Sequence, residues 1–373
     1  MCGASAPTSW SGNKADGHKF GVLVLRTLAL LRGLDPKPRI LIDLNPTNFE
    51  EDWRRAAGAI ERALQLITHV GPDGFGVFDQ KWLPGFGLIP ILAALRAEIE
   101  DRGLGQKERE DLRRWYWCNV FRERYSSAVE SKSRKGYLEM RRHWLEGQPE
   151  PEVFRAAQNW IGASGFRIRS SASYASAVYS GVFFLLALHN AQDWCRGEDT
   201  RLQELQDHHI FPQAYLRRHD IIKRVDVNSI VNRTLISNET NGRIKDRAPA
   251  DYIDDPVIFP MGAGPDLIEP HFIDKVSLGF IRTATEALAY QQAAAIYADF
   301  LQAREAAIIQ EIRSACGITT AAMRTREDAV PDAAAADIQA GAGISEDDDE
   351  SAEAEVQPVE NTTPLNDASA PRL

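Results

Sequence analysis

Apolar residues at helical spacing dominate most of this chain. The clearest case follows the Asn45-Pro46-Thr47 turn, where apolar side chains recur every three or four residues behind an acidic first turn. Its apolar members are Phe49, Trp53, Ala56, Ala57, Ile60, Leu64 and Ile67. Further helices are predicted over about 88–103, 106–127, 130–146, 151–162, 173–193 and 283–313. The sequence therefore predicts a mostly α protein.

The chain carries no sequence feature of a secreted or membrane protein. The N-terminal sequence MCGASAPTSW lacks the basic segment and apolar core of a signal peptide. The apolar stretches at 20–31 and 178–188 are shorter than the roughly 18 residues that span a bilayer. Four cysteines stand singly, with no CxxC pair, which favours a reducing compartment over a disulfide framework. We predict a cytoplasmic protein with no membrane partner.

The formal net charge of −10 is concentrated at the C-terminus. Residues 321–373 include 13 acidic and 3 basic residues, whereas residues 1–320 hold 40 of each sign. The terminal segment has no aromatic residue and is rich in Ala, Asp, Glu and Pro, a composition typical of disorder. Because the rest of the chain is neutral, the acidic total does not exclude a nucleic-acid partner.

One predicted helical stretch combines basic and aromatic residues. Between Arg113 and Arg142 there are 9 basic and 3 acidic residues. The interleaved aromatic residues are Trp115, Tyr116, Trp117, Phe121, Tyr125 and Tyr137. Such a stretch could stack on bases and contact phosphates, but it is more typical of an aromatic core face with a charged solvent face. We favour the structural interpretation.

The segment from Leu205 to Ile253 interrupts the helical pattern. A short run ends in His208-His209-Ile210-Phe211-Pro212, and the proline predicts that a strand stops just after the histidines. Asn232 then precedes a β-prone run, and a Ser/Asn/Thr-rich helix start precedes Asn241. Because successive side chains of a strand point to opposite faces, the two histidines are expected to have different roles.

Hydrolysis of a phosphodiester needs groups that this segment offers. A neutral imidazole is suited to deprotonating water near neutral pH, and a second side chain should fix its tautomer. A divalent cation with few protein ligands leaves positions for the phosphate and neutralises charge on the leaving oxygen. From Gln213 to Pro249 there are 8 basic and 4 acidic residues, which suits a polyanionic substrate.

The ordered residues resemble the HNH endonuclease motif, the ββα-metal finger. In that family a metal ligand directly precedes the general-base histidine, an Asn lies before the second strand, and a closing ligand lies on the helix. The resemblance implies that His208 and Asn241 bind the metal. It also implies that His209 is the general base and that Asn232 orients it. The candidate phosphate contacts on the final helix are Lys245 and Arg243.

Alternatives remain open inside the segment. Asp207 is a third candidate metal ligand, and Asn228 competes with Asn232 as the residue that orients the base. His219 lies in a charged stretch and is expected at the surface. Two non-catalytic explanations are a core histidine pair with loop-capping asparagines and a structural zinc site, although no cysteine lies in the segment.

The flanks resemble a larger family. The sequences DLRRWYWCNVFRERYSS, Ala177-Val178-Tyr179-Ser180, DHHIFP, TLISNETN and APADYI are together similar to the C-terminal half of GmrSD-type modification-dependent restriction endonucleases, over roughly residues 45–315. That family pairs an HNH nuclease with a ParB-like nucleotide-hydrolysing domain that carries an Asp-Gly-Gln-Gln-Arg motif. This chain has no such motif, so the resemblance implies a truncated or split member without nucleotide hydrolysis.

The predicted fold is mostly α, a helical domain with an inserted small ββα-metal (HNH) nuclease module and a disordered C-terminal tail. The predicted divisions are an N-terminal leader and helix (1–45), a helical accessory or linker domain (46–200), the HNH module (201–255), a C-terminal helical region (256–316) and the acidic tail (317–373).

The predicted activity is divalent-metal-dependent hydrolysis of DNA in restriction or defence against foreign DNA. Magnesium is the expected metal, with manganese, nickel or zinc as alternatives because imidazole is a ligand. The expected partners are DNA and a separate ParB-like NTPase subunit. The alternative function is a nucleic-acid-binding or assembly subunit that is inactive without a partner carrying the missing domain.

Overall fold

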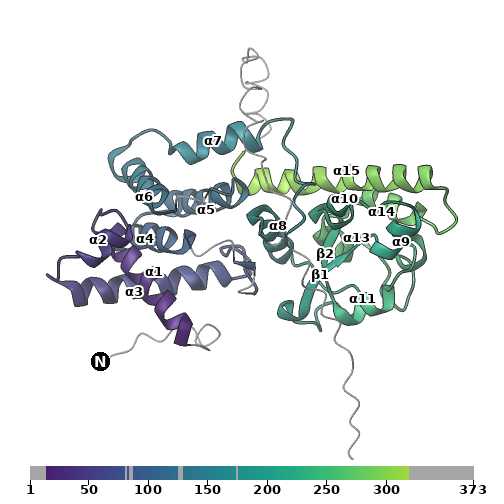
Figure 1. The fold of residues 1–373 in the computed structure, drawn as a ribbon, viewed down its shortest axis with the longest axis horizontal. Coiled ribbons are helices and arrows are strands. Elements are labelled where there is room, and N and C mark those ends of the chain that lie inside the picture. Colours follow the sequence, from purple (N-terminus) through teal and green to yellow (C-terminus); the bar gives the residue numbers. More distant parts are fainter. Residues whose placement is uncertain (1–13, 80–81, 84–86, 125–128, 174, 319–373) are drawn as a thin grey trace, which may run out of the picture. The chain divides into compact units, whose positions relative to one another are not determined.

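The computed structural model describes residues 14–79, 82–83, 87–124, 129–173 and 175–318 (Figure 1). These residues form helices and one antiparallel pair of strands, and they lie within one compact unit, Met1–Thr325. The prediction of a mostly α fold with a small ββα element is confirmed. Residues from 319 onward, which belong to the acidic tail predicted to be disordered, lie outside the described ranges. Residues 1–13, the beginning of the predicted leader, also lie outside them.

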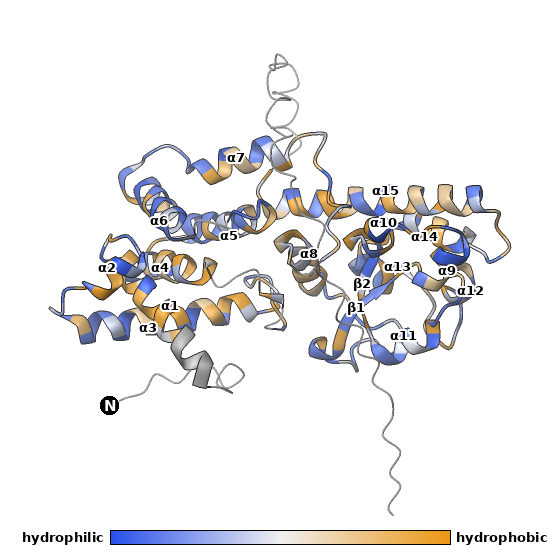
Figure 2. Cartoon of the chain, viewed as in Figure 1, coloured by the Kyte–Doolittle hydropathy of each residue, from blue (hydrophilic) through white to orange (hydrophobic). Residues whose placement is uncertain are grey.

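The N-terminal part of the chain consists of helices. They are α1 (Lys14–Leu31), α2 (Pro38–Ile42), α3 (Phe49–Thr68), α4 (Leu88–Asp101), α5 (Gln106–Phe121), α6 (Val129–Glu146), α7 (Glu152–Ile161) and α8 (Ala177–Leu188). The apolar face predicted for α3 is buried and packs against α1 and α4. Figure 2 shows both apolar and polar residues along α3, as burial of one face requires.

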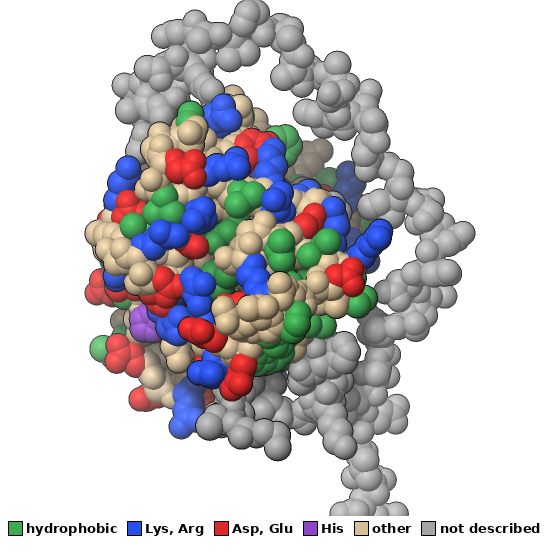
Figure 3. Space-filling view, turned by 90° about the vertical axis from the view of Figure 1, so that its left-hand side faces the viewer, with side chains coloured by type: hydrophobic (Ala, Val, Ile, Leu, Met, Phe, Trp, Pro, Cys, Tyr) green, Lys and Arg blue, Asp and Glu red, His purple; other side chains and the backbone are tan. Residues whose placement is uncertain are grey.

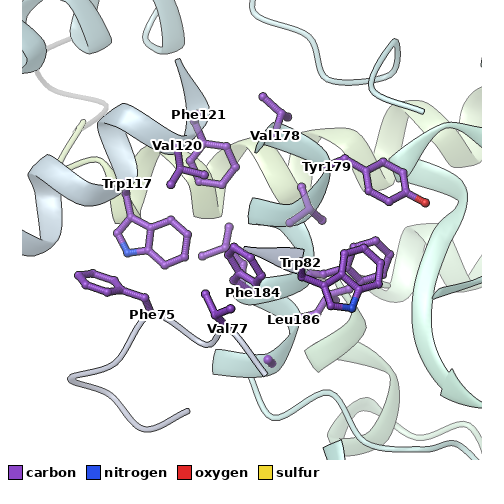
Figure 4. Close-up of a cluster of buried hydrophobic side chains, with 14 of the residues drawn as sticks. Phe75, Val77, Trp82, Trp117, Val120, Phe121, Val178, Tyr179, Phe184 and Leu186 are labelled. Carbon is purple, nitrogen blue, oxygen red and sulfur yellow. The ribbon is translucent and has the colours of Figure 1, made fainter. Parts of the chain in front are cut away.

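Helix α5 carries the aromatic residues that the sequence places among basic ones. Trp115, Tyr116, Trp117 and Phe121 are all buried, and Figure 4 shows Trp117 and Phe121 in one apolar cluster with side chains of α8. The neighbouring cations form ion pairs, such as Arg114 with Glu150 and Lys135 with Glu152. Figure 3 shows basic and acidic side chains intermixed on the face that it presents. The predicted aromatic core face is confirmed for these residues, whereas Tyr125 lies outside the described residues.

The second part of the chain surrounds the strand pair. Strand β1 (Leu205–His209) pairs antiparallel with β2 (Arg233–Ser237), so that His208 lies opposite Thr234 and His209 opposite Arg233. The helices are α9 (Gln213–Arg218), α10 (Arg224–Asn228), α11 (Asn238–Ile244), α12 (Pro249–Tyr252), α13 (Pro265–Ile268), α14 (Lys275–Thr283) and α15 (Tyr290–Ala315). Short 3₁₀ turns cover Leu202–Glu204, Ile230–Asn232 and Glu269–His271.

Helix α15 packs against both parts of the chain. It contacts α5 in the N-terminal part of the chain. In the second part, it contacts α14 and the 3₁₀ turn before β2. The fully buried Arg304 donates to the carbonyl oxygens of Val231 and His271, which compensates for removing the guanidinium from water. The Glu305 carboxylate accepts from the backbone N–H groups of Ile168 and Arg169 at 2.9 and 3.0 Å. These polar contacts fix the loops that lie beside the strand pair.

Candidate functional site

The strand pair brings the two adjacent histidines to one end of β1. The strand ends at His209, and Pro212 begins the next helix as its N-cap, as the sequence predicts. After β2, the hydroxyl of Ser237 accepts a hydrogen bond from the Thr240 N–H and caps α11. Helix α11 packs on both strands, so the chain forms the order strand, strand, helix that a ββα element requires.

His208 lies on the side of the strand pair where α11 begins. Its Nε2 atom is buried and has no hydrogen-bond partner among the described residues. Burial lowers the pKa of His208, whereas the adjacent Asp207 carboxylate and a hydrogen bond with Asn238, the first residue of α11, act in the opposite direction. Asn241 is the fourth residue of the same helix and is half-buried. An imidazole nitrogen without a partner is available to a metal ion.

A buried carboxylate fixes the junction between β2 and α11. Asp193 accepts from the Ser237 N–H and the Thr240 hydroxyl, both at 2.6 Å, and from the N–H groups of Cys195 and Arg196. These hydrogen bonds hold the pKa of Asp193 below its usual value although burial alone would raise it. The loop before β1 therefore holds the start of α11 in place.

His209 faces the other side of the strand pair. Its Nε2 atom lies 3.0 Å from Asn228 Oδ1 and 3.3 Å from Gln213 Nε2. The Arg233 guanidinium, opposite His209 on β2, donates to the same Asn228 oxygen at 3.0 Å. Burial, and then the charge of Arg233, lowers the pKa of His209 to about 3. The imidazole is therefore neutral at pH 7.

The structure places the Asn232 side chain against the backbone and not against the His209 ring. Its carboxamide accepts from the Phe211 N–H at 2.8 Å and donates to the carbonyls of Phe211 and Val227, both at 3.1 Å. Those bonds occupy its fully buried side chain, so Asn232 holds the backbone that follows the histidines instead of contacting the imidazole. Asn228, the competing candidate, is the residue that contacts His209.

Asp207 and His219 are two further candidates from the sequence, and the structure places them in different surroundings. Asp207 accepts from the Tyr179 hydroxyl at 2.5 Å and from Arg233 at 3.4 Å, and it shares the strand face of His209, away from His208. The expectation that His219 lies at the surface is wrong, because only 5% of it is exposed and its ring packs 4.4 Å from that of Tyr215.

The two candidate phosphate-binding residues differ in the contacts that they already make within the chain. Arg243 donates to Glu239 at 2.7 Å and to the Val257 carbonyl at 2.8 Å, so its guanidinium is already bound within the chain. Lys245 is exposed and caps α11 at φ 52°, ψ −123°. That backbone conformation is unfavourable for a residue with a Cβ. Lys245 is the better placed of the two for an external ligand.

The donor set suits a weakly held cation. Among the described residues no three His, Cys, Asp or Glu side chains cluster to hold a metal. His208 offers a free imidazole nitrogen, and Asn241 offers an amide oxygen from the adjacent helix. One neutral imidazole and one neutral amide leave most coordination positions for water and phosphate. An imidazole nitrogen and an amide oxygen are both donor types that a divalent ion accepts.

Sequence reasoning missed Arg233 and Gln213 as members of this cluster. The strand register is the feature that could have pointed to Arg233, because the first residue of β2 pairs with the last residue of β1. Gln213 lies four residues after His209, beyond the proline that ends the strand. No spacing rule links Gln213 to Asn228, because the contact between them depends on how α9 and α10 pack in the folded chain.

Comparisons with known proteins leave the family open. No protein-family model matches the chain, and no solved structure matches it. The chain is similar to Uncharacterized protein MJ0686 of Methanocaldococcus jannaschii, with 27% identity over 310 residues. The alignment covers 79% of this chain and 52% of that protein, so the chain spans about half the length of its relative. Within the described residues, no helix is long and apolar enough to cross a membrane.

Proposed function

We propose that this chain is a divalent-metal-dependent endonuclease of HNH type that hydrolyses phosphodiester bonds of DNA. One observation carries the proposal. Two adjacent histidines of β1 face different sides of a strand, strand, helix element, and the first has a buried Nε2 without a partner. A structural histidine pair would have both rings satisfied by hydrogen bonds, which is not so for His208. The unpaired nitrogen favours a ligand outside the chain.

The residues divide the chemistry between the two faces. His209 is neutral at pH 7 and can accept a proton from water, although a base with a pKa of about 3 is weak. A substrate phosphate beside Arg233 would offset the guanidinium charge and raise that pKa toward the working range. Asn232 holds the Phe211 backbone so that His209 keeps its position at the strand end. Lys245 supplies an exposed cation for the DNA backbone.

His208 and Asn241 are the residues that would hold the cation. The chemistry that a divalent ion supplies when bound there is neutralisation of charge on the departing 3′ oxygen. Magnesium is the proposed ion, and manganese, nickel and zinc are alternatives because imidazole suits them. Since both ligands are neutral, we propose that the ion binds tightly only with DNA present.

The experiment measures nicking of supercoiled plasmid by the purified chain with each of these four ions. Wild-type protein should nick, and His209→Ala should reduce the rate at least about hundredfold, the range for loss of a general base. His208→Ala should also reduce the rate, because it removes a proposed ligand of the ion. His69→Ala serves as the matched control, because His69 is exposed at the end of α3. Equal nicking by His209→Ala would refute the proposed base.

A second candidate is a subunit that becomes active only with a partner protein. The observation that favours it is the environment of His209, whose Nε2 contacts Asn228 Oδ1 at 3.0 Å and whose pKa lies far below 7. We propose a ParB-like NTPase subunit as that partner, and restriction of foreign DNA in the cytoplasm as the role. If plasmid is nicked only after such a subunit is added, the second candidate is supported over the first.

A further inference from the structure

Three hydrogen-bond donors converge on one oxygen beside His209. Asn228 Oδ1 lies 3.0 Å from His209 Nε2, from Gln213 Nε2 and from Arg233 Nη2. A carboxamide oxygen has two lone pairs, so three donors exceed what it can satisfy well. A phosphate oxygen carries more negative charge and accepts more donors. The cluster is thus better matched to an anion than to the neutral amide that occupies it.

The Arg233 guanidinium has further donor capacity that the chain leaves unused. Its Nε atom is buried and has no partner among the described residues. Its Nη1 atom lies 3.4 Å from Asp207, whose same carboxylate oxygen accepts the shorter 2.5 Å bond from Tyr179. A guanidinium presents five donors in a planar fork that matches the oxygens of phosphate. The arginine side chain is 15% exposed.

The amide that occupies the cluster is free to leave without unfolding its helix. Asn228 is the last residue of the five-residue helix α10, and its side chain is half-buried. The Val227 carbonyl next to it is held by the Asn232 carboxamide at 3.1 Å, and the following Ser229 begins a 3₁₀ turn. Because the backbone on both sides is held, rotation of the side chain alone can vacate the position.

We propose that Asn228 Oδ1 occupies the place of a substrate phosphate oxygen, and that Arg233 and Gln213 bind that oxygen once the Asn228 side chain rotates away. This inference rests on the proposed nuclease function and adds the residues that recognise the phosphate. It assigns Asn228 the role of an internal competitor. The resting site is closed by a neutral group that a charged phosphate can displace, because hydrogen bonds to an ionised acceptor are about twice as strong.

The first test measures binding of inorganic phosphate to metal-free protein, followed by NMR of the His209 ring. Removing the competitor in Asn228→Ala should tighten phosphate binding about tenfold, the scale of one or two hydrogen bonds. Adding Arg233→Gln to that variant should abolish the gain. Asn45→Ala, an exposed asparagine, and Arg109→Gln, an exposed arginine of α5, are the matched controls. Unchanged phosphate affinity in Asn228→Ala would overturn the proposal.

The second test replaces the amide by an isosteric carboxylate. Asn228→Asp should place a permanent anion among the three donors, so phosphate binding should weaken about tenfold while the melting temperature does not fall. If Asn228 only orients the imidazole, the carboxylate would do so equally well, and phosphate affinity would match wild type. That result overturns the proposal even if Asn228→Ala is poorly folded.

Plasmid nicking separates this inference from the function on which it rests. If wild-type protein nicks DNA but the Asn228 variants bind phosphate as wild type does, the competitor role fails and the nuclease assignment stands. If phosphate binding responds as expected but no metal ion supports nicking, the anion site stands and the nuclease assignment fails. Expected results in both measurements support Arg233 and Gln213 as phosphate-binding residues of the nuclease.

Discussion

The Tyr179 hydroxyl donates a 2.5 Å hydrogen bond to the Asp207 carboxylate, which joins helix α8 to strand β1. The tyrosine ring is buried against Trp82 and Phe183, and Figure 4 shows its hydroxyl pointing out of the apolar cluster. Asp207 also contacts Arg233. The aromatic core of the helical region therefore positions a residue that contacts the candidate phosphate-binding arginine.

Removal of this hydroxyl should destabilise the protein. Tyr179→Phe leaves the ring in place and deprives Asp207 of a charge-assisted bond, so the free energy of unfolding should fall by about 2 kcal/mol. Urea denaturation followed by tryptophan fluorescence measures the change. Tyr290→Phe is the control, because Tyr290 is 53% exposed. A loss equal to that of the control would mean that the bond contributes nothing measurable.

His271 should make stability depend on pH below neutrality. It is fully buried, accepts from the Thr234 hydroxyl at 2.6 Å and donates to the Gln192 carbonyl at 2.9 Å. Burial lowers its pKa to about 3, whereas in the unfolded chain it titrates near 6.5. Between these values the unfolded state binds a proton that the folded state does not. Its contribution to the free energy of unfolding is therefore present above pH 6.5 and falls by about 1.4 kcal/mol per pH unit as the pH decreases.

His271→Gln tests this dependence. The glutamine keeps a donor for the Gln192 carbonyl but does not titrate, so the variant should be less stable at pH 7 yet lose less stability between pH 6.5 and 4. Chemical denaturation at several pH values gives the slopes. Parallel slopes for variant and wild type would show that another group causes the acid dependence.

The helices were the part of the fold that the sequence could predict. The apolar period of α3 sets its buried face, and the turn before it sets its start. The helix predicted from 283 to 313 begins only at Tyr290, because Ala284 makes a tertiary contact instead. The Ala284 carbonyl accepts a hydrogen bond from the Ala250 N–H of another segment at 3.1 Å. If the helix continued through Ala284, this carbonyl would bond within the helix instead. Local propensity carries no information about such a partner.

The site was predictable only as an ordered set of residues. Strand alternation separates His208 from His209, and Pro212 ends the strand, so these features follow from the sequence. Which asparagine contacts the imidazole depends on a 3₁₀ turn at Ile230–Asn232 that directs Asn232 toward the Phe211 backbone. Packing against α15 holds that turn in place. Because α15 lies far from the turn in the sequence, the spacing of the motif residues gives no information about this contact.

Arg233→Gln should raise the pKa of His209. The guanidinium charge is the second largest cause, after burial, of the low value of about 3, and glutamine removes the charge while retaining a donor for Asn228. An NMR titration of the His209 ring should therefore show protonation at higher pH than in wild type. Arg109→Gln removes an exposed charge of α5 and should leave the titration unchanged. No difference between the two variants would contradict the assigned cause.

Lys245→Gly should stabilise the protein and weaken its binding to DNA. Lys245 adopts φ 52°, ψ −123°, which costs about 1–3 kcal/mol for a residue with a Cβ and little for glycine. The greater freedom of glycine in the unfolded chain offsets up to about 1 kcal/mol, so a net gain near 1 kcal/mol is expected. Loss of the exposed charge should weaken binding to every duplex and reduce the salt dependence by about one phosphate contact. Lys245→Arg, which keeps the charge and the strain, should bind as wild type; equal DNA affinity in the glycine and arginine variants would exclude Lys245 from the interface.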